Sequence, residues 1–358
     1  MFGGRSSEHA ISCVSANSIL AALDPDEFEV LAVGITQQGR WVLVSGDSVP
    51  LAIEDRTLPE ITDKAGPAVV LAPDPTARGP EGIEALSAVD GVRLLAEVDV
   101  VFPVLHGAYG EDGTIQGLFE MADLPYVGAG VFASAAGMDK EFTKKLAAAE
   151  GILVGPYLVL RAGQSLTGVE QEWLGLPVFV KPSRGGSSIG ITKVSDWADF
   201  DAALALAREH DPKVLVEAAV VGREIECGVI EGEYGGAPEA SVPAEIRVLS
   251  DHEFYSFEAK YLDDVCAFDI PADLPAAVIE QVQEYARRTF TALDCAGLAR
   301  VDFFVTPDFE VYLNEINTMP GFTPISMFPR MWAASGLEYP KLVSRLVRTA
   351  LRRGTGLR

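Results

Sequence analysis

Two β-rich runs near the C-terminus carry acidic side chains at matching positions. They are LARVDFFV at 298–305 and VYLNEIN at 311–317, with the turn signal Thr-Pro-Asp between them. The midpoint between Asp302 and Glu315 falls beside that turn, so a hairpin folded there sets the two carboxylates roughly opposite each other. We therefore predict a β-hairpin that brings these two acids together.

Arg300 and Asn317 extend this group, because residues two apart on a strand share a face. Oxygen atoms of Asp302, Glu315 and Asn317 then converge beside a guanidinium group. Hard oxygen ligands on a rigid hairpin suit Mg²⁺ or Mn²⁺ that bridges substrate phosphates. A solvated polar sheet face is the alternative, but the chain continues at 317–321 (NTMPG) into a second glycine turn, which favours a metal site.

A glycine- and serine-rich stretch at 182–190 offers backbone N–H groups that can approach phosphate oxygens. It connects predicted strands at 178–181 and 191–194, so it is a hairpin loop and not the strand-to-helix turn of a P-loop. Lys140 and Lys181 would each add a positive charge at the same phosphates. A flexible hairpin without a ligand is the alternative interpretation.

Two glutamates mark neighbouring strand ends. Glu217 ends the run 214–217, and Glu224 follows seven residues later. Carboxylates in such places can accept hydrogen bonds from a ribose or from an adenine amino group. Taken singly, each is more typical of a surface charge.

The elements that must position these residues fall into two regions. Residues 1–130 alternate short apolar strands, expected at 28–35, 69–72 and 98–105, with helices, which indicates an open α/β domain. Asp139 is expected to cap a helix that presents Phe142, Leu146 and Ala149 on one face and ends at Gly151. Further strands are expected near 214–217, 225–230 and 242–248, and further helices at about 275–293 and 339–353.

The composition excludes several classes of partner. The 358 residues carry a formal net charge of −24, and such a chain repels nucleic-acid phosphates and anionic lipid. No apolar run approaches the ~18 residues needed to cross a membrane. The N-terminal residues lack a signal-peptide pattern, and the four cysteines form no CxxC pair. We expect a cytoplasmic protein with no nucleic-acid or membrane partner.

Four separated stretches resemble signatures of the D-alanine–D-alanine ligases. They are GGRSSEHAISCVSA at 3–16, HGAYGEDG at 106–113, GLARVDFF at 297–304 and NEINTMPG at 314–321. The resemblance covers nearly the whole chain in the expected order. It implies an ATP-grasp fold of mixed α/β and α+β class. The implied parts are an N-terminal α/β substrate domain (1–132), a central lobe (133–216) and a C-terminal lobe (217–358) with a lid at 249–264, the two lobes enclosing ATP.

The same resemblance implies the reaction and its partners. ATP phosphorylates the carboxylate of one D-alanine, and the amine of a second D-alanine displaces phosphate from the acyl phosphate to give D-alanyl-D-alanine for peptidoglycan precursors. Two Mg²⁺ or Mn²⁺ ions are implied, and a homodimer is the common state in the family. Family members usually carry a hydrophobic strand before the Gly-Gly turn. In this sequence only Met1-Phe2 precedes Gly3, so we expect this strand to be almost absent and the protein to be less stable than a form with a longer first strand.

Residue roles also follow from the resemblance. Lys140 and Lys181 would contact the phosphates, and Glu217 and Glu224 the adenosine. Asp302, Glu315 and Asn317 would hold the ions. Glu8 would pair with the ammonium of the first substrate, and His106 would assist at its carboxylate. Ser326 with Lys260 would receive the second carboxylate, Arg300 and the Gly321 N–H would stabilise the oxyanion, and Tyr261 would reach Ser187 and Glu8 to close the lid.

Other readings stay open at this point. Related ligases that make D-alanyl-D-lactate lack a Lys-Tyr pair in the lid, so Lys260-Tyr261 favours the dipeptide. Another ATP-grasp carboxylate–amine ligase would share the metal residues but would not need Glu8, Ser187 and Tyr261 together. A non-catalytic nucleotide-binding protein would not need intact metal ligands, and a dehydrogenase would need the GxGxxG motif that the N-terminus lacks.

Overall fold

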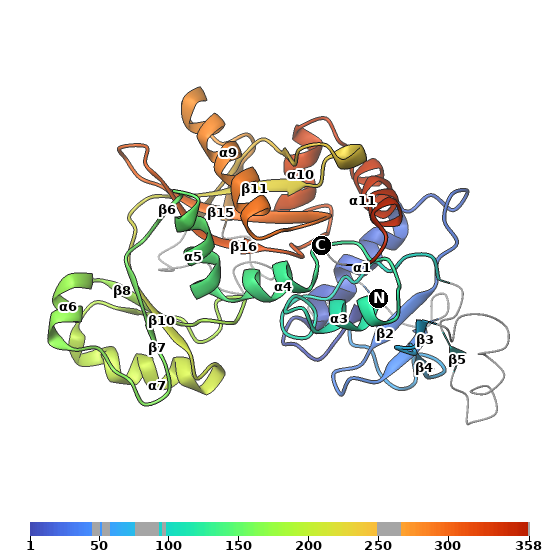
Figure 1. Ribbon diagram of the computed structural model, residues 1–358, viewed down its shortest axis with the longest axis horizontal. Helices are drawn as coiled ribbons and strands as arrows, with labels where there is room; N and C mark the ends of the chain where they lie inside the picture. Colours follow the sequence, from blue (N-terminus) through green and yellow to red (C-terminus); the bar gives the residue numbers. More distant parts are fainter. Residues whose placement is uncertain (45–50, 52–57, 76–92, 95–97, 249–265, 357–358) are drawn as a thin grey trace.

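The computed structural model describes residues 1–44, 51, 58–75, 93–94, 98–248 and 266–356. Their strands form sheets of three, two, four and seven strands, and helices pack against these sheets. In Figure 1 the four-stranded sheet lies at the lower left, the seven-stranded sheet at the top and the N-terminal elements at the right. Helices α4 (Val131–Met138) and α5 (Lys140–Ala149) lie between these three regions.

The N-terminal region is an α/β arrangement around a small sheet. Its elements are β1 (Phe2–Gly3), α1 (His9–Ala22), β2 (Ala32–Ile35), β3 (Trp41–Val44), β4 (Val69–Val70), β5 (Arg93–Leu94) and α3 (Thr114–Met121). Strand β1 pairs in parallel with β2, and Phe2 also forms a bridge with Val104. The two residues of β1 are therefore held on both sides.

The predicted strand at 98–105 is wrong as a continuous strand. In that segment Val101 and Val104 form only isolated bridges, to Tyr126 and Phe2. Pro103 interrupts the run, and proline has no N–H to donate to a ladder. The Val104 N–H instead donates to the Met1 carbonyl at 2.9 Å.

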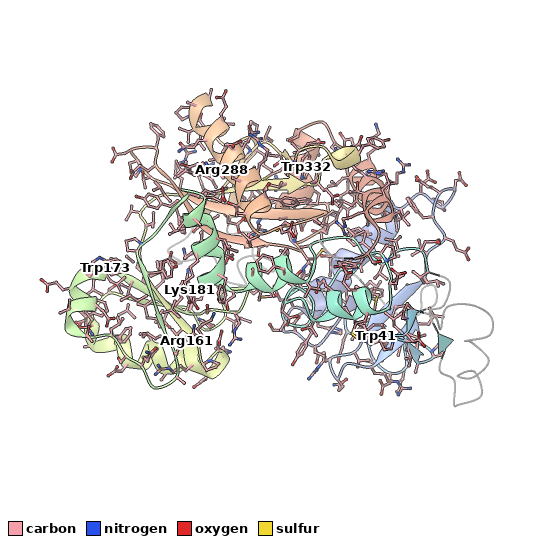
Figure 2. All side chains as sticks on the ribbon, in the orientation of Figure 1. Trp41, Arg161, Trp173, Lys181, Arg288 and Trp332 are labelled. Carbon is pink, nitrogen blue, oxygen red and sulfur yellow. The ribbon has the colours of Figure 1, made fainter. Side chains whose placement is uncertain are left out.

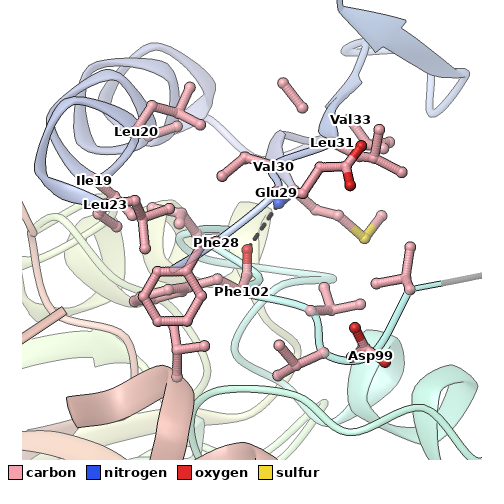
Figure 3. A pocket seen from close by; sticks show the side chains of 18 of the residues that line it. Ile19, Leu20, Leu23, Phe28, Glu29, Val30, Leu31, Val33, Asp99 and Phe102 are labelled. Carbon is pink, nitrogen blue, oxygen red and sulfur yellow. Dashed lines mark hydrogen bonds between the residues drawn. The ribbon is translucent and has the colours of Figure 1, made fainter. Parts of the chain in front are cut away.

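A cavity of about 510 Å³ lies beside the end of α1, as Figure 3 shows. Aliphatic and aromatic side chains such as Leu20, Phe28 and Phe102 dominate its lining, and the Met1 ammonium donates to the Phe102 carbonyl at 2.8 Å. Among the described residues that line it there is none of the predicted site residues. The chemistry predicted from the sequence therefore lies elsewhere.

The four-stranded sheet is antiparallel throughout. Its strands, in spatial order, are β7 (Tyr157–Leu160), β10 (Val214–Ala218), β8 (Val178–Pro182) and β9 (Thr192–Val194), and α6 (Gly168–Leu174) and α7 (Phe200–His210) accompany them. Strands β8 and β9 are consecutive and pair with each other, so the hairpin predicted around the 182–190 loop is confirmed. The short helix η3 (Trp197–Asp199) leads into α7.

The seven-stranded sheet is the largest. Its strands run in the order β14 (Cys266–Asp269), β13 (Ala244–Val248), β11 (Arg223–Ile230), β15 (Leu298–Val305), β16 (Val311–Asn317) and β6 (Leu153–Val154), and β12 (Glu239–Ala240) pairs with β11 after the short helix η4 (Glu233–Gly235). Helices α9 (Ala276–Ala292), α10 (Met327–Ala334) and α11 (Tyr339–Arg353) complete this part. The helices predicted at 275–293 and 339–353 are confirmed.

Strand alternation gives this sheet one apolar and one polar face. Ile225, Cys227 and Val301 join the buried cluster under α9, whereas Glu226 and Asp302 are opposite one another on neighbouring strands and point to the other face. A register shift after Asp302 keeps both Leu313 and Ile316 of β16 in the apolar cluster, although they are three residues apart. The polar face of the sheet therefore carries the charged side chains of the candidate site.

None of the helices in the described parts of the chain combines the length and the apolar character needed to cross a bilayer.

Candidate active site

The hairpin predicted from the two acidic runs is confirmed. In its register Asp302 is opposite Glu315, and Arg300 is opposite Asn317. The Arg300 guanidinium donates from Nε and Nη2 to the two oxygens of Asp302 at 2.8 and 2.7 Å, and Asn317 Nδ2 donates to Asp302 Oδ2 at 2.9 Å. Three of the four predicted side chains are thus in direct contact.

Arg300 is held as a permanent cation. Its Nε also lies 3.2 Å from Oε1 of Glu226 on the neighbouring strand β11. Burial acts to lower the pKa of Arg300, but Asp302 and Glu226 outweigh this effect and raise the pKa above its ordinary value. Two carboxylates therefore fix the plane of the guanidinium group and the direction of its remaining N–H groups.

Lys140, the glycine-rich loop and Glu315 meet at one point. Lys140 Nζ donates to the Gly185 carbonyl at 2.8 Å and lies 3.2 Å from Oε2 of Glu315. A crevice beside this point is lined by Gly186 and Asn317, among other residues. Residues distant in the sequence thus place a lysine, a flexible backbone loop and a carboxylate together.

The glycine-rich loop also reaches the N-terminal region. Ser187 Oγ donates a short hydrogen bond to Oε1 of Glu8, which precedes α1. Ser187 and Ser188 have φ of 53° and 59°, in the left-handed region that disfavours residues with a Cβ. The contact with Glu8 therefore helps to hold a loop conformation that the serine backbone would not choose alone.

His106 connects helix α1 with the backbone at Met319 instead of pointing free into the site. Its Nδ1 is 2.9 Å from the Met319 carbonyl and its Nε2 is 3.2 Å from Ser15 Oγ. Burial lowers the pKa of His106, which favours a neutral ring with one N–H donor. Both ring nitrogens are engaged within the protein, so the expected contact with a substrate carboxylate would require one of these bonds to open.

Glu111, which the sequence analysis did not select, holds the same loop. Its Oε2 accepts from the Gly107 N–H at 2.6 Å, and its Oε1 accepts from the Met319 N–H at 3.1 Å. Burial, followed by the neighbouring charge of Glu8, raises the pKa of Glu111 to about 8. His106 and Glu111 together fix the Met319 backbone, two residues before Gly321.

Helix α5 begins as predicted but buries a different face. Asp139 caps it, accepting from the Glu141 N–H at 3.2 Å. Phe142, one of the apolar residues expected on one face, is 47% exposed, whereas Lys140 and Lys144 are buried. The apolar face named from the sequence is therefore not the face that this helix buries, because the helix faces charged partners on β10 and β16 and not an aliphatic core alone.

Glu217 is the partner of two buried lysines, Lys144 of α5 and Lys181 of β8. Its Oε1 accepts a short hydrogen bond from Lys144, and its Oε2 lies 2.6 Å from Lys181 Nζ. Burial acts to raise the pKa of Glu217, but Lys144 and Lys181 prevail and hold it below its usual range. Figure 2 shows Lys181 on the side of the four-stranded sheet that faces α5. Glu224 lies on β11, two residues before Glu226 and on the same strand face.

The remaining predicted residues are placed as follows. Ser326 precedes α10, and its Oγ accepts from the Thr323 N–H at 3.1 Å. Gly321 lies in the turn after β16 and is partly buried. Lys260 and Tyr261, with the rest of the segment 249–264 expected to form a lid, lie outside the described residues.

The donor set on the hairpin fits a hard divalent cation. Asp302 and Glu315 are carboxylates, Asn317 adds an amide, and in this structure cationic groups of Arg300 and Lys140 lie against the two acids. Positions that already attract cations between oxygen donors suit Mg²⁺ or Mn²⁺. Within the described ranges no group of three or more His, Cys, Asp or Glu side chains forms a metal site, so any ion here would also need the amide and substrate oxygens.

Sequence reasoning missed Glu226, Glu111 and Lys144. Glu226 could have been found from its period-two spacing with Glu224, and Lys144 from its position one helical turn after Lys140. Glu111 lies within the stretch 106–113 but gave no signal of its own.

Comparisons with known proteins place the chain among ligases. Residues 1–129 match the family model described as D-ala D-ala ligase N-terminus, and residues 146–348 match D-ala D-ala ligase C-terminus. The chain is 60% identical over 364 residues to a D-alanine–D-alanine ligase of Mycobacterium avium, covering 100% of this chain and 97% of that protein. It is 61% identical over 363 residues to a ligase of the same name from Rhodococcus erythropolis, with 100% and 97% covered.

Solved structures agree with this placement. The D-alanine–D-alanine ligase of Coxiella burnetii has a TM-score of 0.79 at 34% identity, covering 98% of this chain and 94% of that chain. VanG, a D-Ala:D-Ser ligase from Enterococcus faecalis, has a TM-score of 0.78 at 32% identity, with 98% and 97% covered. The fold is the ATP-grasp fold predicted from the sequence, and the chain belongs to the D-alanine–D-alanine ligase family of enzymes.

Proposed function

We propose that the protein condenses two molecules of D-alanine to D-alanyl-D-alanine, using ATP and passing through D-alanyl phosphate. The observation that carries this proposal is the meeting of Lys140 with Gly185 and Glu315. A lysine, a glycine-rich loop and a carboxylate lie together at the edge of a crevice, and they would bind the phosphates and a metal ion. Phosphoryl transfer needs this combination, because it depends mainly on positioning and on neutralising charge.

The first step uses the cationic side chains. Lys140 and Lys181 would neutralise the phosphates of ATP, while Glu217 and Glu224 would face the adenosine. Glu8 would hold the ammonium of the first D-alanine, with His106 and Ser187 beside it. The Ser187–Glu8 hydrogen bond supports this role, because it brings the glycine-rich loop over the place where the first substrate would bind.

The second step uses donors fixed on the C-terminal hairpin. The Arg300 guanidinium and the Gly321 N–H would stabilise the oxyanion that forms when the second amine attacks the acyl phosphate. Ser326 and Lys260 would hold the second carboxylate, and Tyr261 would close the lid over the site. The double restraint of Arg300 by Asp302 and Glu226 supports its role, because a fixed donor needs no reorganisation during the reaction.

Asp302, Glu315 and Asn317 would hold the divalent cations, two Mg²⁺ or Mn²⁺ ions. When bound, these ions would offset the negative charge of the transferring phosphoryl group. Lys140 would then give up its contact with Glu315 and turn to the phosphates.

The wider assignment follows from this chemistry. The central lobe (133–216) and the C-terminal lobe (217–358) would enclose ATP, and the N-terminal substrate domain (1–132) would lie beside them. We place the protein in a bacterial cytoplasm as a homodimer, where its product feeds peptidoglycan precursor assembly and cell-wall formation.

Mass spectrometry of products, with a phosphate-release assay, tests this function. ATP and D-alanine together should release phosphate and yield D-alanyl-D-alanine, and neither alone should do so. D-Lactate and D-serine, each offered as the second substrate at neutral pH, should yield little mixed product. Preferential formation of a D-lactate or D-serine product would replace the proposed substrate, and no phosphate release with any of them would reject the ligase reaction.

A further inference from the structure

Lys144 is a buried cation with no role in the function proposed above. Its side chain is 0% exposed, on a helix that exposes the neighbouring Lys145 to 55%. Lysine is almost never fully buried unless it is paired, because desolvation disfavours the charged form. Lys144 has such a pair in Glu217, and its Nζ also lies 5.9 Å from the centre of the Tyr157 ring. Solvent and small ligands do not reach it.

Glu217 divides its carboxylate between a buried lysine and a functional one. Oε1 accepts from Lys144 and Oε2 lies 2.6 Å from Lys181. The side chains of Glu217 and Lys181 are each 8% exposed, so each remains close to solvent-accessible space, whereas Lys144 is sealed. Glu217 thus pairs with both lysines, and of the two only Lys181 is close enough to solvent to exchange Glu217 for another partner.

We propose that Lys144 is a positioning residue that acts as a buried counter-ion of Glu217 and so allows Lys181 to move to the phosphates of the nucleotide. This inference rests on the proposed function, in which Lys181 binds ATP. When Lys181 turns to the phosphates, Glu217 keeps Lys144 and is not left as a lone buried charge. Without Lys144, Lys181 would be the only partner of Glu217 among these lysines. Moving Lys181 to the phosphates would then leave Glu217 as an unpaired buried charge, which costs free energy and would weaken ATP binding.

The test measures ATP binding by isothermal titration calorimetry and steady-state kinetics of the full chain. Lys144→Met should weaken ATP binding by at least tenfold and raise KM for ATP by a similar factor, with KM for D-alanine within twofold of the parent. Lys145→Met is the matched control, because it removes an exposed lysine one position away, and it should change neither quantity.

A counter-ion role for Lys144 predicts an effect that depends on the charge of Glu217, whereas a purely structural role does not. Once Glu217→Gln has removed the anion, no carboxylate remains to hold Lys181. Adding Lys144→Met in that background should therefore change ATP affinity by less than threefold. The proposal would be overturned if Lys144→Met lowered ATP affinity tenfold both in the parent and in Glu217→Gln. It would also be overturned if Lys144→Met alone bound ATP as tightly as the parent.

If Lys144→Met alone does not fold, the ATP affinities of Glu217→Gln and of the double variant are compared instead. A difference of less than threefold would support the proposal, and a difference of tenfold would overturn it. Different results would refute the ligase function and the counter-ion role of Lys144. A parent protein that releases no phosphate from ATP and D-alanine refutes the ligase function. An active parent, with ATP affinity indifferent to Lys144, refutes only the counter-ion role.

Discussion

Replacing Asp139 should destabilise the protein by an amount set by a buried charge and not by helix capping alone. Its Oδ1 accepts from the Glu141 N–H at 3.2 Å and from Ser183 Oγ at 2.8 Å, and its Oδ2 accepts a short hydrogen bond from Lys213. The side chains of Asp139 and Lys213 are each 8% exposed. The same carboxylate therefore caps α5 and neutralises a buried ammonium.

The two contributions can be separated in magnitude. Losing a helix cap costs about 1 kcal/mol, and breaking a buried ion pair by removing one partner costs about 3–5 kcal/mol. Glu141 Oε2 remains 3.0 Å from Lys213 Nζ and offsets part of the second loss. We expect the free energy of unfolding to fall by about 3–4 kcal/mol in Asp139→Ala. Asp139→Asn should lose about 2–3 kcal/mol, because asparagine caps as well as aspartate but carries no charge.

Urea unfolding followed by circular dichroism measures these losses. Asp196→Ala is the control, because Asp196 is an exposed cap that accepts from the Ala198 N–H at 2.9 Å, and it should lose no more than about 1 kcal/mol. Stability of Asp139→Asn within about 0.5 kcal/mol of the parent, at an unchanged denaturant slope, would refute the buried-charge reasoning. Asp139→Ala should also raise KM for ATP, since α5 begins with Lys140.

Three further outcomes are expected. Glu315→Gln should lower kcat by about 100-fold or more with the fold intact, because a metal-ligand charge is lost; near-normal turnover would contradict the metal assignment. Burial raises the pKa of Glu111 to about 8, so the folded protein binds an extra proton there and the free energy of unfolding should fall as pH rises from roughly 4.3 to 8. Glu111→Gln should reduce the fall of the urea midpoint over this pH range. An unchanged fall in Glu111→Gln would show that other groups cause it. Burial raises the pKa of the Cys13 and Cys227 thiols to about 12, so Ellman's reagent should label them only after unfolding; rapid native labelling would argue against their burial.

Local patterns in the sequence were enough to place the C-terminal hairpin. Asp302 and Glu315 were predicted to be opposite each other from strand alternation and one turn signal, and the register agrees. The Asp139 cap was likewise readable, because capping depends on residues next to each other in the chain. Both features are fixed by short-range geometry.

Features set by distant partners were not readable. The buried face of α5 is chosen by Glu217, 73 residues from Lys144 along the chain, and by Glu315 on β16. Apolar periodicity therefore selected Phe142, which is exposed instead. In the segment 98–105 the apolar composition concealed the effect of Pro103, whose missing N–H prevents a continuous ladder.

The arrangement of charges explains how so acidic a chain can receive a polyanion. The net charge is −24, yet the three cations of the proposed site that lie among the described residues are each held against a carboxylate, in the pairs Lys140–Glu315, Lys181–Glu217 and Arg300–Asp302. These pairs hold the cationic side chains in place before the nucleotide arrives. In the proposed function, binding ATP would be an exchange of partners, in which the phosphates take the two lysines and a divalent cation takes the Glu315 carboxylate that Lys140 releases. Glu217 is the one acid that no incoming cation would compensate in this exchange, because it lies on the other sheet, and Lys144 is the buried charge that remains beside it.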